Sequence, residues 1–457
     1  MSPRPSVQPF SRRGACPALS APMQTGDGLL SRVAFTAALS ATDLDCLSAL
    51  ARRHGNGLLD ITARGGLQLR GLTAESAAAL ERDVLALDLP LRQGLAVEMS
   101  PIAGLDSREI ANPAPILGGI SQRATALGLD TKLAAKMSVI VDGGGLVSMG
   151  GLLADIRLKA FLRDGGIVWL LMLGGAEDKA LVAGSVQPHD AADCVIDLLL
   201  HLAQRGPDAR GRDLDMATVH DVCGDRLLSA PPAALAPSVY ADAGRRADQR
   251  RLWSLTGGIC VAVIAPAFGQ ITSDALSALC QRASDIGFQS IRPGPHHALY
   301  AVGLDDSCHA LLYYAESAGF VVSDGDPRSS IAVCAGAPAC ASAFTPVQSL
   351  AEFAAKECRD MLDGSFTLHL SGCGKGCAHP APALLAFSGM SDGLSFGYKA
   401  KVSAPSDAVL AGSQAQAGLS RLARLYEKEH KPGENARNLL VRLGKDKVIA
   451  ALRQDET

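Results

Sequence analysis

Apolar residues recur along this chain in a pattern that is present twice. The sequence Leu-Ser-Ala-Leu occurs at 47–50 and again at 276–279, each time in a segment whose apolar residues are spaced as on one face of a helix. Polar residues that are good helix N-caps open both segments. Apolar runs that predict strands stand on either side of each helix, at 28–33 and 58–61 in the first copy and at 258–264 and 288–291 in the second. Each copy is therefore predicted to be a strand–helix–strand unit, half of a ferredoxin-like domain, and the two halves are expected to pair into one sheet.

A second kind of unit is also present twice. Residues 138–141 predict a strand that runs into the glycine-rich segment 142–145, and residues 366–370 predict a strand that runs into 371–374. The predicted fold class is therefore α+β, with a duplicated order of half-domain and α/β domain. The predicted parts are an N-terminal extension with the first half-domain (1–90), a first α/β domain (91–230), the second half-domain (251–322) and a second α/β domain (323–457) that ends in two amphipathic helices within 419–453. A segment rich in Ala and Pro, 231–250, is expected to link the two halves.

Composition and charge narrow the possible functions. The chain has 457 residues, of which 48% are apolar, so it is long enough for about two to four domains and a large core. Its formal net charge of -3 gives no electrostatic reason to expect nucleic acid as a partner. Residues 1–21 lack the apolar core of a signal peptide, and no apolar run is long enough to predict a membrane span. We therefore expect a cytoplasmic protein with reduced thiols and with neither nucleic acid nor a membrane as a partner.

Four of the twelve cysteines stand out by their spacing. Five residues separate Cys334 from Cys340, three separate Cys373 from Cys377, and Gly and Ala surround both pairs. Thiolates suit iron–sulfur clusters, zinc and Cu(I), and small neighbours let backbone N–H groups approach the sulfur atoms. Structural zinc usually has about two to four residues between paired ligands, so the wider spacing favours an iron–sulfur cluster and leaves zinc as the alternative. In the first copy Gly144 takes the place of Cys373, so the ligands are predicted in one copy alone.

This duplicated order, with these cysteines in its second half, resembles the sulfite/nitrite reductase superfamily over residues 13–452. The resemblance implies the superfamily's architecture, in which two ferredoxin-like half-domains pair and two α/β domains flank them. It also implies a [4Fe–4S] cluster on Cys334, Cys340, Cys373 and Cys377. In the reductases the last cysteine, at the position of Cys377, also bridges the cluster to sirohaem.

Two short segments resemble one branch of that superfamily, which acts on a free tetrapyrrole in aerobic cobalamin biosynthesis. They are residues 13–28, with Arg-Gly-Ala-Cys-Pro and Met-Gln-Thr-Gly-Asp-Gly, and residues 369–380, with His-Leu-Ser-Gly-Cys-Gly-Lys-Gly-Cys-Ala-His-Pro. The narrower resemblance implies an O2-dependent hydroxylation of precorrin-3A at C20, with closure of a γ-lactone by the ring A acetate. It also implies NADH as the ultimate reductant, and it leaves open an additional non-haem iron. The alternatives are a sirohaem-dependent sulfite or nitrite reductase, a tetrapyrrole carrier with a structural cluster, and a zinc-bound structural protein.

A polycarboxylate tetrapyrrole requires arginine and lysine side chains around it. Residues 62–70 resemble the family's Thr-x-Arg-x-x-x-Gln tetrapyrrole segment, which implies that Arg64 and Gln68 bind the substrate. If this segment is a strand, Arg70 shares their face, because side chains repeat every two residues. The alternative for all three is a solvated strand face.

Two lysines are further candidates for binding the substrate. Lys136 matches the first of two lysines with which the reductases bind their oxyanion, and Ser138 replaces the second. The family's Asn-Arg-Asn element also has no counterpart after Ser100, and both departures count against sulfite or nitrite as the substrate. Lys375 lies inside the last cysteine turn and is expected to face either substrate carboxylates or solvent. No residue is assigned as catalytic.

Four histidines near these segments have open roles. Adjacent strand residues face opposite ways, so His296 and His297 could bind one iron only in an irregular turn. His369 and His379 flank the second cysteine pair, where either a site role or a structural role is possible. No dinucleotide fingerprint follows a strand, so electrons from NADH are expected to arrive through an electron-donor protein.

Overall fold

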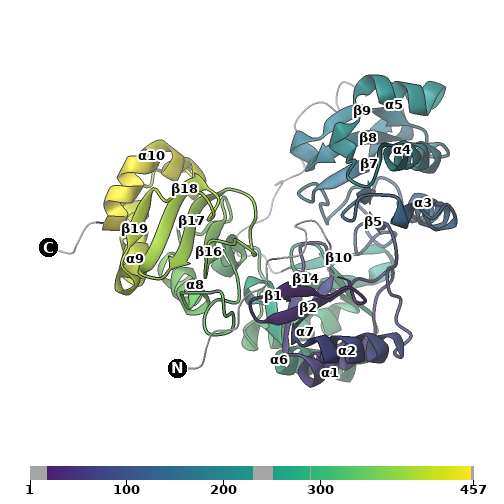
Figure 1. The fold of residues 1–457 in the computed structure, drawn as a ribbon. Coiled ribbons are helices and arrows are strands. Elements are labelled where there is room, and N and C mark those ends of the chain that lie inside the picture. The colour runs from purple at the N-terminus through teal and green to yellow at the C-terminus, as the bar shows by residue number, and fades with distance from the viewer. Residues whose placement is uncertain (1–17, 230–250, 289, 454–457) are drawn as a thin grey trace.

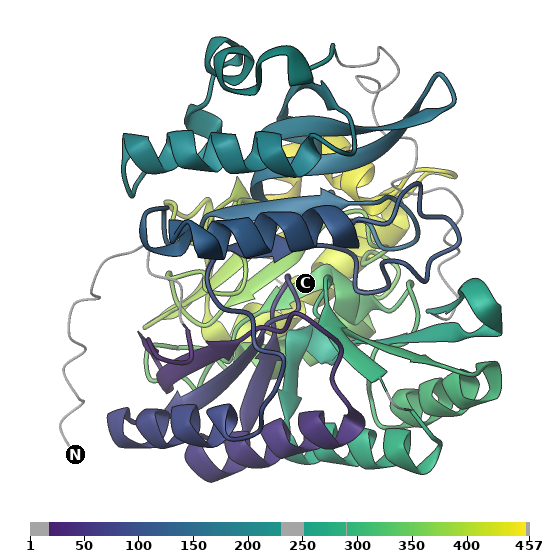
Figure 2. The same cartoon turned by 90° about the vertical axis from the view of Figure 1, so that its right-hand side faces the viewer.

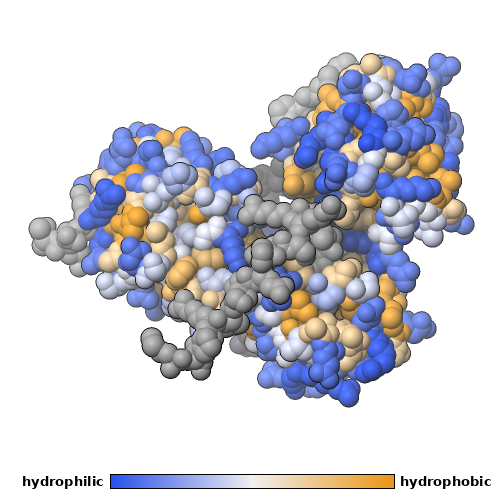
Figure 3. Space-filling view, viewed as in Figure 1, coloured by the Kyte–Doolittle hydropathy of each residue, from blue (hydrophilic) through white to orange (hydrophobic). Residues whose placement is uncertain are grey.

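The structure is a computed structural model that describes residues 18–229, 251–288 and 290–453. Three bodies can be distinguished in it: the two half-domains together, one α/β domain at the left and the other at the upper right (Figure 1). In the same view, polar and apolar residues are interspersed over all three bodies (Figure 3). The segment 13–17 and the expected linker 231–250 lie outside the described residues.

The first half-domain is a sheet backed by helices. The strands, in sheet order, are β1 (Met23–Thr25), β2 (Gly28–Val33), β4 (Leu67–Leu72), β3 (Leu58–Ile61) and β12 (Gln270–Thr272). The helices are α1 (Ala41–His54) and α2 (Ala74–Leu85). Helix α1 begins at a capping box, in which the Ser40 hydroxyl accepts the Asp43 N–H at 3.0 Å. The predicted strand–helix–strand order of this copy is confirmed.

The second half-domain repeats the order but keeps its own sheet. The strands, in sheet order, are β10 (Leu252–Ser254), β11 (Cys260–Ile264), β14 (Ala298–Gly303) and β13 (Ser290–Gly294). The helices are α6 (Ser273–Asp285) and α7 (Asp305–Ser317). The expectation of one joint sheet is wrong, because β11 pairs with β14 and only the short β12 of this half pairs with β3 of the first.

The two half-domains share one apolar core. Leu47 of α1 and Leu276 of α6, the residues that carry the repeated sequence, both belong to it and are at most 1% exposed. The Ser48 hydroxyl donates to the Ser273 carbonyl at 2.6 Å, which links the same two helices. Figure 2 shows the helices of both halves along one face of the two sheets. The opposite faces of the sheets are therefore available to line a site.

The two α/β domains have one topology. In the first, the strands in sheet order are β5 (Ala96–Glu98), β6 (Ser138–Asp142), β7 (Ala154–Arg163), β8 (Gly166–Gly175) and β9 (Leu181–Val186), with helices α3 (Ala114–Ala126), α4 (Ala191–Arg205) and α5 (Met216–Cys223). In the second they are β15 (Ile331–Val333), β16 (Leu368–Ser371), β17 (Ala383–Met390), β18 (Gly393–Ala400) and β19 (Ala408–Leu410), with α8 (Val347–Glu357), α9 (Ala415–Glu429) and α10 (Ala436–Arg453). In both, the first three strands of the sheet are parallel and the remaining pairs are antiparallel.

This topology brings together the segments that the sequence singled out. The loops that leave β15 and β16 start at the same sheet edge, because these strands are parallel neighbours. The loops that leave β5 and β6 do the same in the first domain. Among the helices of the described ranges, none has the length and apolarity needed to cross a bilayer.

Candidate functional site

A cavity of about 740 Å³ lies where the half-domains meet the second α/β domain. Its lining includes Arg32 and Arg70 of the first half-domain, Trp253 and Tyr300 of the second, and the loops that follow β15 and β16. The cavity thus combines aromatic rings with cations, which suits a large, flat ligand that carries acidic groups.

All four singled-out cysteines line this cavity. Cys334 and Cys340 come from the loop after β15, and Cys373 and Cys377 come from the loop after β16. Burial and then the neighbouring thiols raise the pKa of the Cys377 thiol, and both factors also raise that of Cys373. The thiols are therefore close enough to influence one another electrostatically.

The surroundings of the thiols explain part of the sequence signature. The Gly372 N–H donates to the Cys334 sulfur at 3.2 Å. A Cβ atom on Gly26 would stand 2.1 Å from the Cys340 sulfur, and the Gly26 carbonyl accepts the Ala341 N–H at 2.8 Å. The N-terminal segment 23–28 thus lies against the cysteine loop, and glycine is needed there to leave room for the thiol.

The thiols do not form a compact site for one ion. In the part of the chain that the structure describes, no three or more His, Cys, Asp or Glu side chains converge closely enough to hold a single metal ion. The same finding applies to an additional iron: the described residues offer it no set of ligands. All four thiols nevertheless line one cavity.

Gln68 and Arg70 both line the main cavity. Arg70 donates from Nε and Nη2 to both Asp27 carboxylate oxygens at 2.8 Å, and from Nη1 to Asp60 at 2.7 Å. Burial opposes the charge of Arg70, but the two carboxylates outweigh it and raise the pKa of the guanidinium. The amide of Gln68 lies between Asp60 and Arg32. These contacts fix a charged guanidinium at the cavity surface.

Further cations at the cavity were not identified from the sequence. Arg32 of β2, Arg251 before β10 and Arg328 in the turn Pro327–Ser330 all line it. Arg251 pairs with Asp324 at 2.9 Å, and Arg328 pairs with Asp326 at 2.6 Å. Arg32 could have been found from the sequence, because it is a charged residue within a mostly apolar strand. Arg251 and Arg328 could not, because only the fold brings them to the same cavity as residues of β2 and β4.

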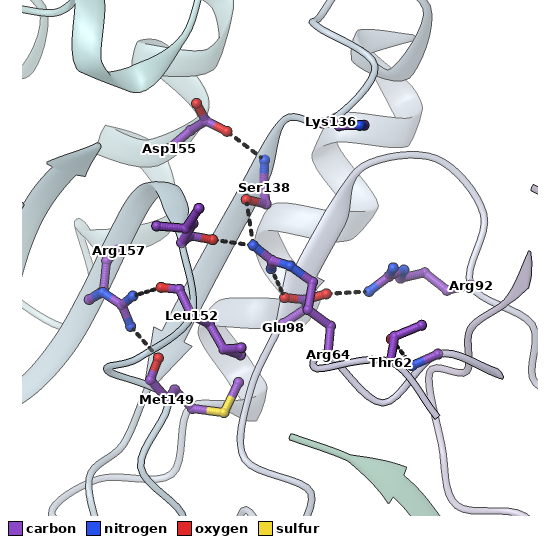
Figure 4. A network of polar contacts seen from close by, with 12 residues as sticks. Thr62, Arg64, Arg92, Glu98, Lys136, Ser138, Met149, Leu152, Asp155 and Arg157 are labelled. Atoms are coloured by element: carbon purple, nitrogen blue, oxygen red, sulfur yellow. Dashed lines mark hydrogen bonds and ion pairs between the residues drawn. The ribbon is translucent and has the colours of Figure 1, made fainter. Parts of the chain in front are cut away.

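Arg64 does not share a face with Gln68 and Arg70. It lies in the turn between β3 and β4, where Gly65 has a φ of 77°, so the strand alternation does not extend to it. Arg64 pairs with Glu98 and lines a second cavity of about 140 Å³ (Figure 4). The expected common face is therefore wrong for this residue.

The two lysines lie in different places. Lys136 is exposed just before β6, lines neither cavity, and in Figure 4 its side chain points away from Arg64. Lys375 lines the main cavity, and its Nζ donates to the Ser342 hydroxyl at 2.9 Å.

The four candidate histidines also lie in different places. His296 and His297 form the turn between β13 and β14, have positive φ values of 61° and 58°, and line the cavity. His297 Nδ1 lies 2.6 Å from the Ile61 carbonyl oxygen, which occupies that nitrogen. His369 is fully buried, neither ring nitrogen has a hydrogen-bond partner, and burial and then His379 lower its pKa to about 4. His369 therefore lies beneath the cysteine loop, whereas His379 reaches the cavity.

Comparison with known proteins gives the class of protein first. Residues 21–87 match the nitrite/sulfite reductase ferredoxin-like half domain. The fold is similar to that of the Mycobacterium tuberculosis NirA protein, with a TM-score of 0.69, 18% identity, and coverage of 92% of this chain and 84% of that one. The ferredoxin–nitrite reductase of Synechococcus elongatus is 27% identical over 158 residues, which are 32% of this chain and 31% of the relative. The protein thus has the duplicated architecture of the nitrite/sulfite reductase superfamily.

A narrower relationship covers nearly the whole chain. A precorrin-3B synthase of Sinorhizobium sp is 38% identical over 445 residues, which are 97% of this chain and 95% of the relative. The chain therefore belongs to the precorrin-3B synthase family.

Proposed function

We propose that the protein hydroxylates precorrin-3A at C20 with O2 and closes a γ-lactone with the ring A acetate, as a step of cobalamin biosynthesis. The main support is the cavity of about 740 Å³, because thiols, cations and aromatic rings line one space. The substrate is a polycarboxylate macrocycle, so it needs cationic side chains around its edge and apolar contact with its faces.

The chain's own residues bind and orient the substrate in this proposal. Arg70, held by Asp27 and Asp60, presents a fixed guanidinium, and the other cavity arginines and Lys375 pair with further carboxylates. Trp253 packs against the macrocycle. Fixed contacts of this kind place one ring carbon next to the reacting centre and reduce the entropy lost on reaction.

The four cysteines are proposed to hold a [4Fe–4S] cluster. Four thiols that line one cavity and the N–H donated to Cys334 support such a cluster, while the described residues show no compact group of ligands for a single zinc ion. When bound, the cluster supplies single electrons to chemistry that side chains cannot perform. We propose NADH as the ultimate reductant and an electron-donor protein between the two. An additional iron has no ligand set among the described residues, so no role is derived for it.

The test is turnover of precorrin-3A by protein purified without oxygen. An iron–sulfur shoulder that dithionite bleaches, with O2 consumed and precorrin-3B formed, is the expected result. Sharp bands of bound sirohaem, with reduction of sulfite or nitrite, would support the alternative reductase. Cys340→Ser is expected to remove the shoulder and the turnover but to retain part of the affinity for precorrin-3A. Cys46→Ser, in α1 outside the cavity, is the matched control and is expected to behave as the unmodified protein. Full turnover by a cluster-free Cys340→Ser protein would refute the proposal.

A further inference from the structure

The loop between β6 and β7, residues 143–153, contributes to the lining of both cavities. Val147 of this loop lines the main cavity and is buried in an apolar cluster with Val261 and Tyr300 of the second half-domain. Met149, two residues later, lines the smaller cavity. The loop has no regular secondary structure, and hydrogen bonds from backbone and side-chain groups hold its conformation.

Two arginines hold carbonyl groups of this loop from different sides. Arg157 of β7 is 1% exposed and donates to the Met149 carbonyl at 3.0 Å and to the Leu152 carbonyl. Arg64, from the first half-domain, donates to the Leu153 carbonyl. Figure 4 shows both guanidinium groups beside the loop, with Arg157 on the far side from Arg64. Arg64 therefore ties the loop to the half-domain whose strand β4 carries Gln68 and Arg70.

The charge of Arg64 is already matched within the protein. Glu98 is 7% exposed, pairs with Arg64 and also accepts from Arg92 Nη1 at 2.9 Å. Arg64 also lines the smaller cavity and not the main one, so a carboxylate of a substrate in the main cavity is not expected to reach it. A fork-shaped guanidinium can serve Glu98 and the Leu153 carbonyl at once, which suits a structural contact.

We propose that Arg64 is a positioning residue. Together with Glu98 it fixes the 143–153 loop, and with it the side of the main cavity that Val147 forms, and it does not bind a substrate carboxylate. The inference deepens the proposed function and rests on it for the identity of the substrate.

Hydrogen exchange of the full chain without substrate tests the positioning directly. The Leu152 N–H, which bonds to the Met149 carbonyl at 3.2 Å, reports on the loop. In Arg64→Met, amides of residues 146–153 are expected to exchange about tenfold faster, because the loop loses a charge-assisted hydrogen bond. Arg64→Lys is expected to exchange as fast as Arg64→Met, since an ammonium group does not span both acceptors. The matched control is Ser138→Ala, which removes a 3.4 Å contact with Arg64 and is expected to leave exchange unchanged. Unchanged exchange in Arg64→Met would overturn the proposal.

Two further measurements distinguish a positioning role of Arg64 from global unfolding and from substrate binding. Should Arg64→Met unfold globally, Glu98→Gln is the second variant, with faster exchange expected in the same residues. For precorrin-3A binding, positioning predicts that Arg64→Lys and Arg64→Met weaken affinity equally. A lysine variant with nearly full affinity beside a much weaker methionine variant would show that Arg64 binds the substrate by its charge. Failure of the unmodified protein to convert precorrin-3A would refute the proposed function alone, because the exchange experiment uses no substrate.

Discussion

Replacing Gly26 by alanine is predicted to displace the Cys340 thiol from the cavity. The new Cβ atom would stand 2.1 Å from the sulfur, whereas non-bonded heavy atoms are most stable about 3.5–4.0 Å apart. Overpacking of this kind typically costs about 1–3 kcal/mol, and rotation of the thiol is the easiest way to relieve it. The same Cβ would also approach the Ser342 backbone nitrogen at 3.3 Å, so a shift of the whole loop is resisted.

The assay is the iron content and visible absorption of protein purified without oxygen. If Cys340 is a cluster ligand, the unmodified protein contains about four iron atoms per chain and Gly26→Ala contains less than about half of that. Gly412→Ala is the matched control, because a Cβ there meets no atom within 4 Å. A Gly26→Ala protein with full iron content and an unchanged spectrum would refute this reasoning. Iron-free unmodified protein would instead refute the cluster itself.

The remaining predictions concern buried charge. Arg70→Met leaves Asp27 without its cation and is expected to lower the free energy of unfolding by about 3–5 kcal/mol, measured with urea, because the Asp27 side chain is 1% exposed. Burial favours a raised pKa for Asp27, but the hydrogen bonds and charge of Arg70 lower that pKa overall. The stabilisation that Arg70 gives to the Asp27 carboxylate is therefore present at neutral pH and is lost as pH falls below the ordinary carboxyl range. An unfolding midpoint equal to that of the unmodified protein would contradict this. His369 has a pKa lowered from 6.5 to about 4, so the unfolded chain binds a proton that the folded chain does not, and stability is expected to decline as pH drops through that interval. His369→Phe is expected to flatten the decline, and an equal slope in both proteins would show that His369 is not its source.

Much of the fold is readable from local pattern. The repeated Leu-Ser-Ala-Leu sequences are both in buried helices, and the strands around them form where apolar runs predict them. The spacing of the four cysteines, with glycine and alanine beside them, predicts a shared cluster, and the structure places all four at one cavity. What the sequence did not predict is the sheet arrangement, because the pairing of β12 with β3 joins residues more than two hundred positions apart, such as Ile271 and Leu59.

By itself, then, the sequence determined the duplicated helices and strands and the four candidate ligand cysteines. Both depend on the spacing of residues that are near one another along the chain. Only the tertiary structure decided which cations face the cavity. Arg70 points into it and Arg64 does not, because a turn at Gly65 intervenes and Glu98 of another domain pairs with Arg64. Arg251, just before β10, reaches the cavity from a segment remote in sequence. The interaction between two charges depends on their distance in space, whereas a sequence pattern gives only their separation along the chain.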